Sequence, residues 1–103
     1  MSQTELPELD PVIHAQARLR IMAALSTLEA DGSISFPRLQ ELLDMTAGNL
    51  STHLRKLEDA SYVDITKTHK GRTPITYLGL SKKGRRAFED YMDNLRTVLG
   101  EQP

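Results

Sequence analysis

Short polar side chains and two cations follow one another between residues 46 and 56 of this sequence. Hydroxyl, amide and imidazole groups come first, and an arginine and a lysine follow about one helical turn later. Groups of these types hydrogen-bond to base edges in the major groove of DNA, and the cations suit phosphates or guanine. The candidate contact residues are Thr46, Gly48, Asn49, Ser51, Thr52, His53, Arg55 and Lys56.

Each of these residues also has an ordinary structural interpretation. Asn49 could pair with adenine, but it could equally hydrogen-bond within its own helix. His53 could be a solvated side chain, and Arg55 and Lys56 could be helix-surface charges without a partner. The residue types alone therefore leave both interpretations open.

A second basic segment lies further along the chain. Residues 68–73 predict a flexible, basic loop tip, from which Arg72 could reach a narrow minor groove that attracts arginine. Arg85 and Arg86 either contact DNA or form ion pairs within the chain. The candidates for phosphate contacts are Lys67, Lys70, Lys82 and Lys83.

The charge of the chain is unevenly distributed. The whole sequence has a formal net charge of −1, but residues 46–86 hold nine basic and three acidic residues, a net charge of +6. The segments 1–31 and 87–103 each have a net charge of −3. A basic block between acidic flanks favours an anionic partner such as nucleic acid, although a solvated surface could carry the same block by chance.

The elements that must position these side chains are predicted from apolar spacing and cap residues. Asp10 followed by Pro11 is typical of a helix start. Apolar residues continue at helical spacing as far as Leu28, and Asp31 with the next glycine would end the helix. We therefore expect a first helix at 11–30.

Residues 33–60 predict a very short strand and two more helices. Ser35 is a suitable cap for a helix that ends before Asp44, and Thr46 is a suitable cap for a helix at 46–60. The residues expected to face inward from this third helix are Leu50, Leu54 and Leu57.

Residues 62–80 predict a β-hairpin, and residues 82–99 predict a last helix. Alternating and β-branched residues form the two strands, and a glycine at 71 marks the turn between them. Ser81 is a suitable cap for the last helix. Its apolar stripe repeats at spacings of four, three and four, in the residues Phe88, Met92, Leu95 and Leu99.

The segment TAGNLSTHLRKLE at 46–58, followed by Tyr62 and Val63, resembles the recognition helix and wing start of MarR/ArsR-type winged-helix transcriptional regulators. LSKKGR at 80–85 resembles their junction into the last helix. The similarity covers residues 11–99. It implies a mainly α winged helix-turn-helix with a small β-hairpin, in the order α-β-α-α-β-β-α, whose third helix and wing contact DNA.

The last helix has more apolar surface than one small domain can cover. We expect it to pack against the first helix of a second copy and so to form a homodimer. The alternative is that it folds back on its own domain. The residues expected at the dimer contact are Ile13, Ile21, Phe88, Tyr91, Met92, Leu95 and Leu99.

Other chemistries lack the residues they need. The absence of cysteine excludes disulfides and thiolate metal sites. His14, His53 and His69 are not spaced as a ligand pair, the glycines form no phosphate-binding loop, and no serine has a nucleophile-elbow context. We therefore expect no enzyme activity, no metal and no cofactor, and the alternative that stays open is a metal site of carboxylates and histidine between two subunits.

The length of 103 residues predicts one domain, at 10–103, after a flexible N-terminal arm at 1–9. The first residues are acidic and polar, and no apolar run approaches the ~20 residues of a membrane helix. We expect a cytoplasmic protein without a membrane partner.

Together these features predict a sequence-specific regulator of transcription that binds double-stranded DNA. The expected form is a dimeric repressor that reads a palindromic operator through helix 46–60 and hairpin 62–80. The alternative is a winged-helix module that binds only protein. A small-molecule effector, if one acts, would bind between the first and last helices, because that interface would set the spacing of the reading helices.

Overall fold

The computed structural model describes residues 6–100, and within them the chain forms four helices and three strands. Their order confirms the predicted fold class, mainly α with a hairpin. The elements are α1 (Gln16–Ser26), β1 (Ile34–Ser35), α2 (Phe36–Leu43), α3 (Ala47–Asp59), β2 (Val63–Lys70), β3 (Thr73–Leu80) and α4 (Lys82–Val98).

Three helices begin at the cap residues that the sequence predicts. The side chain of Ser35 accepts a hydrogen bond from the backbone N–H of Arg38 at the start of α2. Thr46 accepts from Asn49 in α3 at 3.1 Å, and Ser81 accepts from a backbone N–H in the first turn of α4 at 2.9 Å. Such caps satisfy helix N–H groups that otherwise lack a partner, and they stabilise a helix by about 1 kcal/mol each.

The first helix is shorter than the predicted range 11–30. Asp10 does not cap it, because its carboxylate accepts from Val12 N–H at 2.8 Å and its carbonyl accepts from His14 N–H at 2.7 Å, which closes a turn. Ala15 then adopts an extended conformation at φ −141°, and α1 begins only after it. The pattern at Asp10 and Pro11 therefore marks a separate turn that precedes the helix.

The three strands form one antiparallel sheet in the order β1-β3-β2. Val63 pairs with Leu80 at the base of the hairpin, and Lys70 pairs with Thr73 at its tip. The tip is a two-residue turn in which Gly71 has a φ of +65°, so the predicted loose loop at 68–73 is instead a paired hairpin end.

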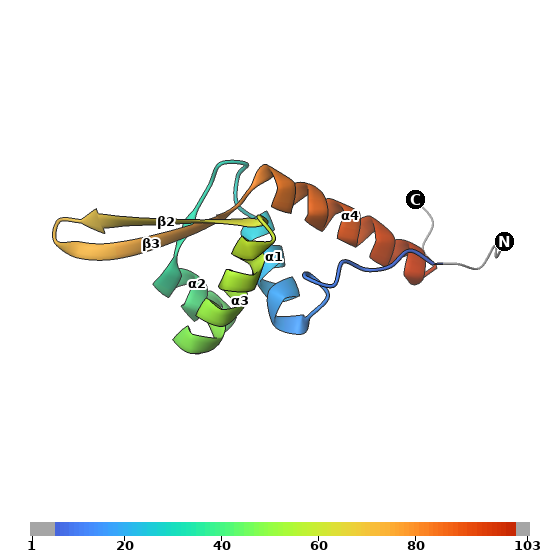
Figure 1. Cartoon of the computed structure of the whole chain (residues 1–103), viewed down its shortest axis with the longest axis horizontal. Coiled ribbons are helices and arrows are strands. Elements are labelled where there is room, and N and C mark those ends of the chain that lie inside the picture. The colour runs from blue at the N-terminus through green and yellow to red at the C-terminus, as the bar shows by residue number, and fades with distance from the viewer. Residues whose placement is uncertain (1–5, 101–103) are drawn as a thin grey trace.

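Only the base of the hairpin joins the core. Figure 1 shows α1, α2 and α3 on one side of the hairpin, while its far end extends beyond them. The core takes residues from every element except β1, and from the turn before α1. Its buried residues are Ile13, Ile21, Met22, Leu25, Leu39, Leu43, Leu50, Leu54, Leu57, Val63, Leu78, Leu80 and Tyr91.

The start of α4 is held against the link between α3 and β2 by a close backbone contact. A Cβ atom added at Gly84 would overlap the carbonyl oxygen of Tyr62, so only glycine fits at this position. The backbone N–H of Ser81 donates to the same carbonyl at 3.0 Å, and its hydroxyl donates to Ser61 O at 2.5 Å. This junction sets the direction in which α4 leaves the domain.

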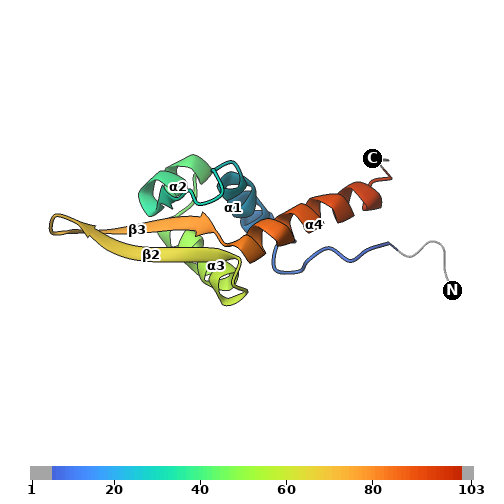
Figure 2. The same ribbon diagram turned by 90° about the horizontal axis from the view of Figure 1, so that it is seen from above.

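The molecule is elongated, with principal extents of 60 × 25 × 22 Å. Its radius of gyration is 15.4 Å, whereas a compact domain of this length has about 13 Å. Figures 1 and 2 show the reason, since the hairpin projects at one end and α4 at the other. The two projections carry different kinds of side chain.

Candidate nucleic-acid interface

Helix α3 buries one face and exposes the other. Leu50, Leu54 and Leu57 are at most 2% exposed and pack in the core, as their spacing predicts. Within residues 6–100, no other part of the chain covers the opposite face. Its exposed residues are Gly48, Asn49, Ser51, Thr52, Arg55 and Lys56.

The N-terminal end of α3 is open to close approach. A Cβ atom added at Gly48 would meet nothing within 4 Å, so the glycine is not required by packing inside this chain. Thr52 donates its hydroxyl to Gly48 O at 2.9 Å and keeps an acceptor position free, and Thr46 serves as the cap. The N–H groups of a helix start favour a phosphate, so this end suits a DNA backbone.

His53 differs from its neighbours because it is half-buried against α1. Its Nδ1 lies 3.4 Å from a guanidinium nitrogen of Arg18. Burial, the charge of Arg18 and the charge of Lys56 lower the pKa of His53 below its usual range, in that order of importance. A neutral imidazole is therefore the favoured form at neutral pH.

The hairpin of β2 and β3, called the wing from here on (residues 63–80), presents the cations that the sequence predicts. Lys67 and Lys70 lie on β2 and Arg72 lies in the tip, and all three are exposed. Lys82 and Lys83 are exposed at the start of α4, where the ammonium of Lys83 sits 5.8 Å from the centre of the Tyr62 ring. These cations line the hairpin and its base rather than the far end of α4.

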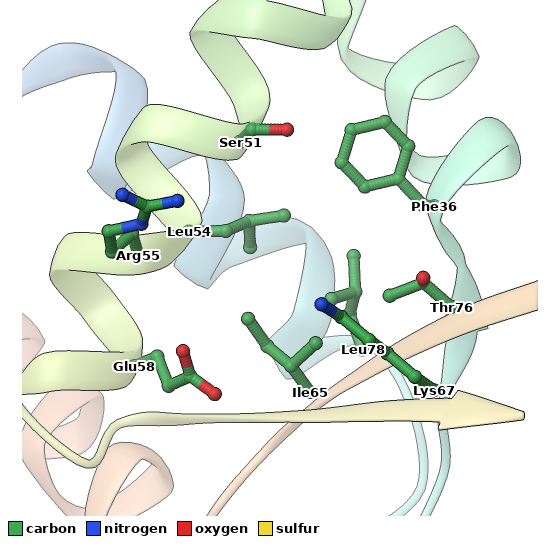
Figure 3. Close-up of a pocket in the computed structure, with 9 residues that line it drawn as sticks. All are labelled: Phe36, Ser51, Leu54, Arg55, Glu58, Ile65, Lys67, Thr76 and Leu78. Carbon is green, nitrogen blue, oxygen red and sulfur yellow. The ribbon is translucent and has the colours of Figure 1, made fainter.

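A groove of about 680 Å³ separates α3 from the wing. Figure 3 shows the ammonium of Lys67 pointing into this space from β2, opposite Ser51 and Arg55 on α3. Apolar side chains form part of the lining, and Glu58 adds one carboxylate. The remaining lining residues are Phe36, Leu54, Ile65, Thr76 and Leu78.

Sequence reasoning missed the groove residues Glu58 and Thr76. Ser51, Arg55 and Glu58 follow one another at spacings of four and three, so they share one side of α3. That spacing could have identified Glu58, but the position of Thr76 depends on the pairing of β3 with β2, which only the fold reveals. The groove places two cations and two hydroxyl groups beside an apolar floor, a combination that suits a sugar-phosphate backbone.

Arg85 and Arg86 make contacts within the chain. Arg85 donates to the carbonyl of Leu28 at 3.4 Å, and Arg86 lies 3.9 Å from the carboxylate of Asp90. These contacts match the ion-pair alternative for Arg86 and a structural role for Arg85. Neither residue belongs to the groove between α3 and the wing.

The predicted dimer residues divide into two groups. Ile13 and Ile21 are fully buried and Tyr91 is 2% exposed, so these three side chains face the core of their own chain and have no surface for a second copy. Leu99 is 64% exposed and the nearby Val98 is 37% exposed. The partly buried members of the stripe are Phe88, Met92 and Leu95.

The remaining predictions concern an effector, a metal ion, the membrane and the ends of the chain. A pocket of about 470 Å³ lies between residues 8–11 and α4, and the effector between the first and last helices stays a prediction. Within residues 6–100 no group of three His, Cys, Asp or Glu could hold a metal ion, and no helix is long and apolar enough to cross a membrane. Residues 1–5 of the predicted arm and residues 101–103 of the predicted domain lie outside the described part of the chain.

Comparison with known proteins supports this fold. A family model described as a winged helix DNA-binding domain matches residues 17–99. An uncharacterized protein of Methanocaldococcus jannaschii is 38% identical over 82 residues, which cover 79% of this chain and 85% of that protein.

Solved structures give the same result. A transcriptional regulator homologue from Pyrococcus horikoshii OT3 has a TM-score of 0.78 at 28% identity, covering 86% of this chain and 85% of that one. MepR of S. aureus, solved as a complex with DNA, has a TM-score of 0.64 at 18% identity. That match covers 78% of this chain and 63% of MepR, and at this identity it shows a shared fold alone.

Proposed function

Since this chain belongs to the winged helix DNA-binding domain family, we propose that it is a dimeric transcriptional repressor that binds a palindromic site in double-stranded DNA. The observation that carries the proposal is the bare polar face of α3 beside a basic hairpin, with a groove between them. A domain that bound only protein would not need its cations gathered around one helix and one hairpin. The DNA complex of the similarly folded MepR is consistent with this assignment.

In this proposal α3 enters the major groove with its N-terminal end first. Asn49 and Thr52 contact base edges, and the open surface at Gly48 lets the helix approach closely. Arg55 and Lys67 hold a phosphate strand that runs along the groove between helix and wing. Arg72 at the tip reaches the adjacent minor groove. The full proposed set is Thr46, Gly48, Asn49, Ser51, Thr52, His53, Arg55, Lys56, Lys67, Lys70 and Arg72.

The proposed dimer forms through the outer part of α4. This helix projects from the domain and leaves Leu99 and Val98 exposed near its end, where a second copy would cover them. A two-fold dimer places two recognition helices about 34 Å apart and so matches a palindromic site. A dimer that occupies a promoter blocks polymerase, and repression is the simplest outcome of that contact.

The salt dependence of DNA binding tests the interface. Removing one cation that neutralises a phosphate lowers the slope of log affinity against log salt by about one. We expect this change for Lys70→Ala, measured by fluorescence anisotropy on mixed duplex DNA at several salt concentrations. The matched control is Arg96→Ala, which removes an equal charge from the far end of α4, where Arg96 pairs with Asp93 at 2.9 Å.

Equal slopes for both variants would contradict the assignment of the wing. Weak binding with an almost flat slope for the unmodified protein would instead favour the protein-binding alternative. Selection of bound sites from random duplex DNA tests the finer claim. We expect two inverted half-sites whose centres lie about 10 base pairs apart, or a multiple of that spacing.

Light scattering at micromolar concentration tests the dimer. We expect twice the mass of one chain, and we expect Leu99→Asp to shift the protein toward monomer, because a carboxylate would be placed in an apolar contact. Leu42→Asp is the control, since Leu42 is 61% exposed on α2, away from α4. A monomeric unmodified protein would refute the proposed dimer.

A further inference from the structure

Arg18 connects the turn before α1 with the recognition helix. Its Nε donates to the carbonyl of Val12 at 2.5 Å, and one terminal nitrogen lies 3.5 Å from the carbonyl of Pro11. The other terminal nitrogen lies 3.4 Å from Nδ1 of His53. The two carbonyl contacts hold the guanidinium in place, so its position relative to His53 does not depend on the single contact with the ring.

This contact has a chemical consequence for the imidazole. A guanidinium has five N–H donors and no acceptor, so Nδ1 of His53 can contact Arg18 only through its lone pair. The proton of the neutral ring must then lie on Nε2. Among residues 6–100, Nε2 makes no hydrogen bond, so the N–H group that Arg18 selects is free for another molecule.

The charges around His53 favour the same neutral form. Arg18 approaches from α1 and Lys56 from the next turn of α3, and both cations oppose a positive imidazole. Asp59 lines the same pocket as these two cations, and among residues 6–100 no hydrogen bond or ion pair joins its carboxylate to the ring. His53 is therefore placed to act through a directed N–H group and not through its charge.

The position of His53 on α3 relates this N–H group to the proposed DNA surface. Asn49, His53 and Lys56 follow one another at spacings of four and three, and so they share one side of the helix. Asn49 and Lys56 are both exposed. The side chain of His53 thus lies in a row whose other two members, Asn49 and Lys56, are exposed.

We propose that Arg18 is a positioning residue for DNA recognition, which fixes His53 in the tautomer with the proton on Nε2 so that this atom donates to a DNA acceptor. The inference rests on the proposed function, because the acceptor is a guanine N7 or O6 or a phosphate oxygen. Sequence reasoning did not identify Arg18, which lies on a different helix and, in this proposal, does not touch DNA.

The tautomer of His53 can be measured in the free protein by long-range ¹H–¹⁵N NMR at pH 7.5. We expect a bare Nδ1 and a protonated Nε2 in the unmodified protein. We expect a mixture of both tautomers in Arg18→Ala and in Arg18→Lys. The lysine variant keeps the charge, but a single ammonium does not match the fixed fork of the guanidinium, which reaches three acceptors.

Arg20→Ala is the matched control, because Arg20 lies on the same helix and donates to Leu43 O at 2.7 Å. It should leave the His53 tautomer unchanged. An unchanged backbone amide spectrum in Arg18→Lys shows that the turn survives. A protonated Nδ1 in the unmodified protein, or an unchanged tautomer in both Arg18 variants, would overturn the inference without affecting the proposed DNA binding.

DNA affinity provides the second readout. We expect Arg18→Ala to weaken binding about 3- to 10-fold at pH 7.5, the effect of one hydrogen bond. In a His53→Ala background the same change should cost nothing further, because its effect passes through the imidazole. An undiminished loss in that background would overturn the positioning role. Absence of DNA binding by the unmodified protein would refute both the proposed function and this inference.

Binding-site selection then identifies the acceptor. If Nε2–H donates to guanine, His53→Ala relaxes sequence preference at one position of each half-site. If it donates to phosphate, the variant weakens binding to all sequences equally. Either pattern supports the proposal, and an affinity unchanged by His53→Ala contradicts it.

Discussion

Helices α3 and α4 are both amphipathic, but they bury their apolar faces to different extents. The three leucines of α3 are buried within the chain, and apart from Ala47 the side chains that remain outside are polar or charged, with the acidic Glu58 and Asp59 confined to the last turn. In α4 the apolar stripe is only partly covered, and the exposure rises to 64% at Leu99. The outer surface of α4 also carries the acidic residues Glu89, Asp90 and Asp93.

This difference indicates which partner each end can accept. The surface of α3 needs no further apolar burial, so its natural complement is a polar polyanion. The end of α4 still exposes apolar groups beside negative charge, so its natural complement is another apolar protein surface. In the proposed function, one small domain thus separates DNA binding from self-association along its length.

The largest expected effect compares a leucine from each helix. Leu54→Ala should reduce the free energy of unfolding by about 3 kcal/mol, because it leaves a cavity at a site that is 2% exposed. Leu99→Ala should cost no more than about 0.5 kcal/mol in dilute protein, since its side chain is mostly in solvent. Urea unfolding followed by circular dichroism measures both. Similar losses would show that the end of α4 is covered within the chain.

Gly84→Ala tests the junction that joins the two regions. The new Cβ would collide with the carbonyl of Tyr62, a backbone atom that cannot turn aside, and the loss of stability should be about 2–3 kcal/mol. The measurement is thermal and urea unfolding of the variant beside the unmodified protein. An unaltered stability would mean that α4 can shift without cost.

Alkaline pH tests the hydrogen bond that the hydroxyl of Tyr62 donates to Asp10. Burial, a hydrogen bond to Asp10 and the charge of that carboxylate raise the pKa of Tyr62 to about 12 from 10.0. The folded chain then keeps the phenol proton at a pH at which the unfolded chain releases it. The stabilisation is full below pH 10 and disappears as the pH rises to 12. Because Tyr62 is only partly buried and solvent screens the charge of Asp10, the expected loss is reduced to about 1.5 kcal/mol.

The measurement for Tyr62 is the urea midpoint at several pH values between 9 and 12. Tyr62→Phe lacks the titrating phenol, so its stability should fall less steeply over this range. Parallel curves for the two proteins would indicate that Tyr62 titrates normally and that Asp10 does not hold it.

The smallest expected effect separates folding from binding in α3. Gly48→Ala should stabilise the chain by about 0.5–1 kcal/mol, because alanine favours the helix and the added Cβ meets nothing within 4 Å. The same methyl group should weaken DNA binding, since it stands where the helix approaches the bases. The two measurements are urea unfolding and anisotropy. A variant that gains stability and binds DNA unchanged would move the contact surface away from this end of α3.

Local signals predicted most of the fold. Ser35, Thr46 and Ser81 cap their helices as expected, because a cap depends on a side chain and a backbone N–H only three residues away. The hairpin was also predictable, because β-branched residues flank a glycine whose φ of +65° suits a tight turn. The exposed face of α3 follows from the spacing of its leucines.

Long-range contacts explain what the sequence did not reveal. The turn at Asp10 depends on Tyr62, which donates to its carboxylate at 2.5 Å from across the domain. His14 in the same turn lies 2.9 Å from the hydroxyl of Tyr91, and that contact helps to turn Tyr91 inward. Apolar periodicity cannot tell a residue that faces the core of its own chain from one that faces a second chain. Three of the predicted dimer residues were therefore placed on the wrong surface.

Because Gly84 at the base of α4 fits closely against Tyr62, a change at this contact would tilt the whole helix as a rigid arm. The helix has 17 residues and is about 25 Å long, so a rotation of about 10° at its base would displace its tip by about 4 Å. A crowded pivot of this kind resists small rotations. Any ligand or substitution that loosened the pivot would act at a distance, through the angle of the arm and without touching the surface at its end.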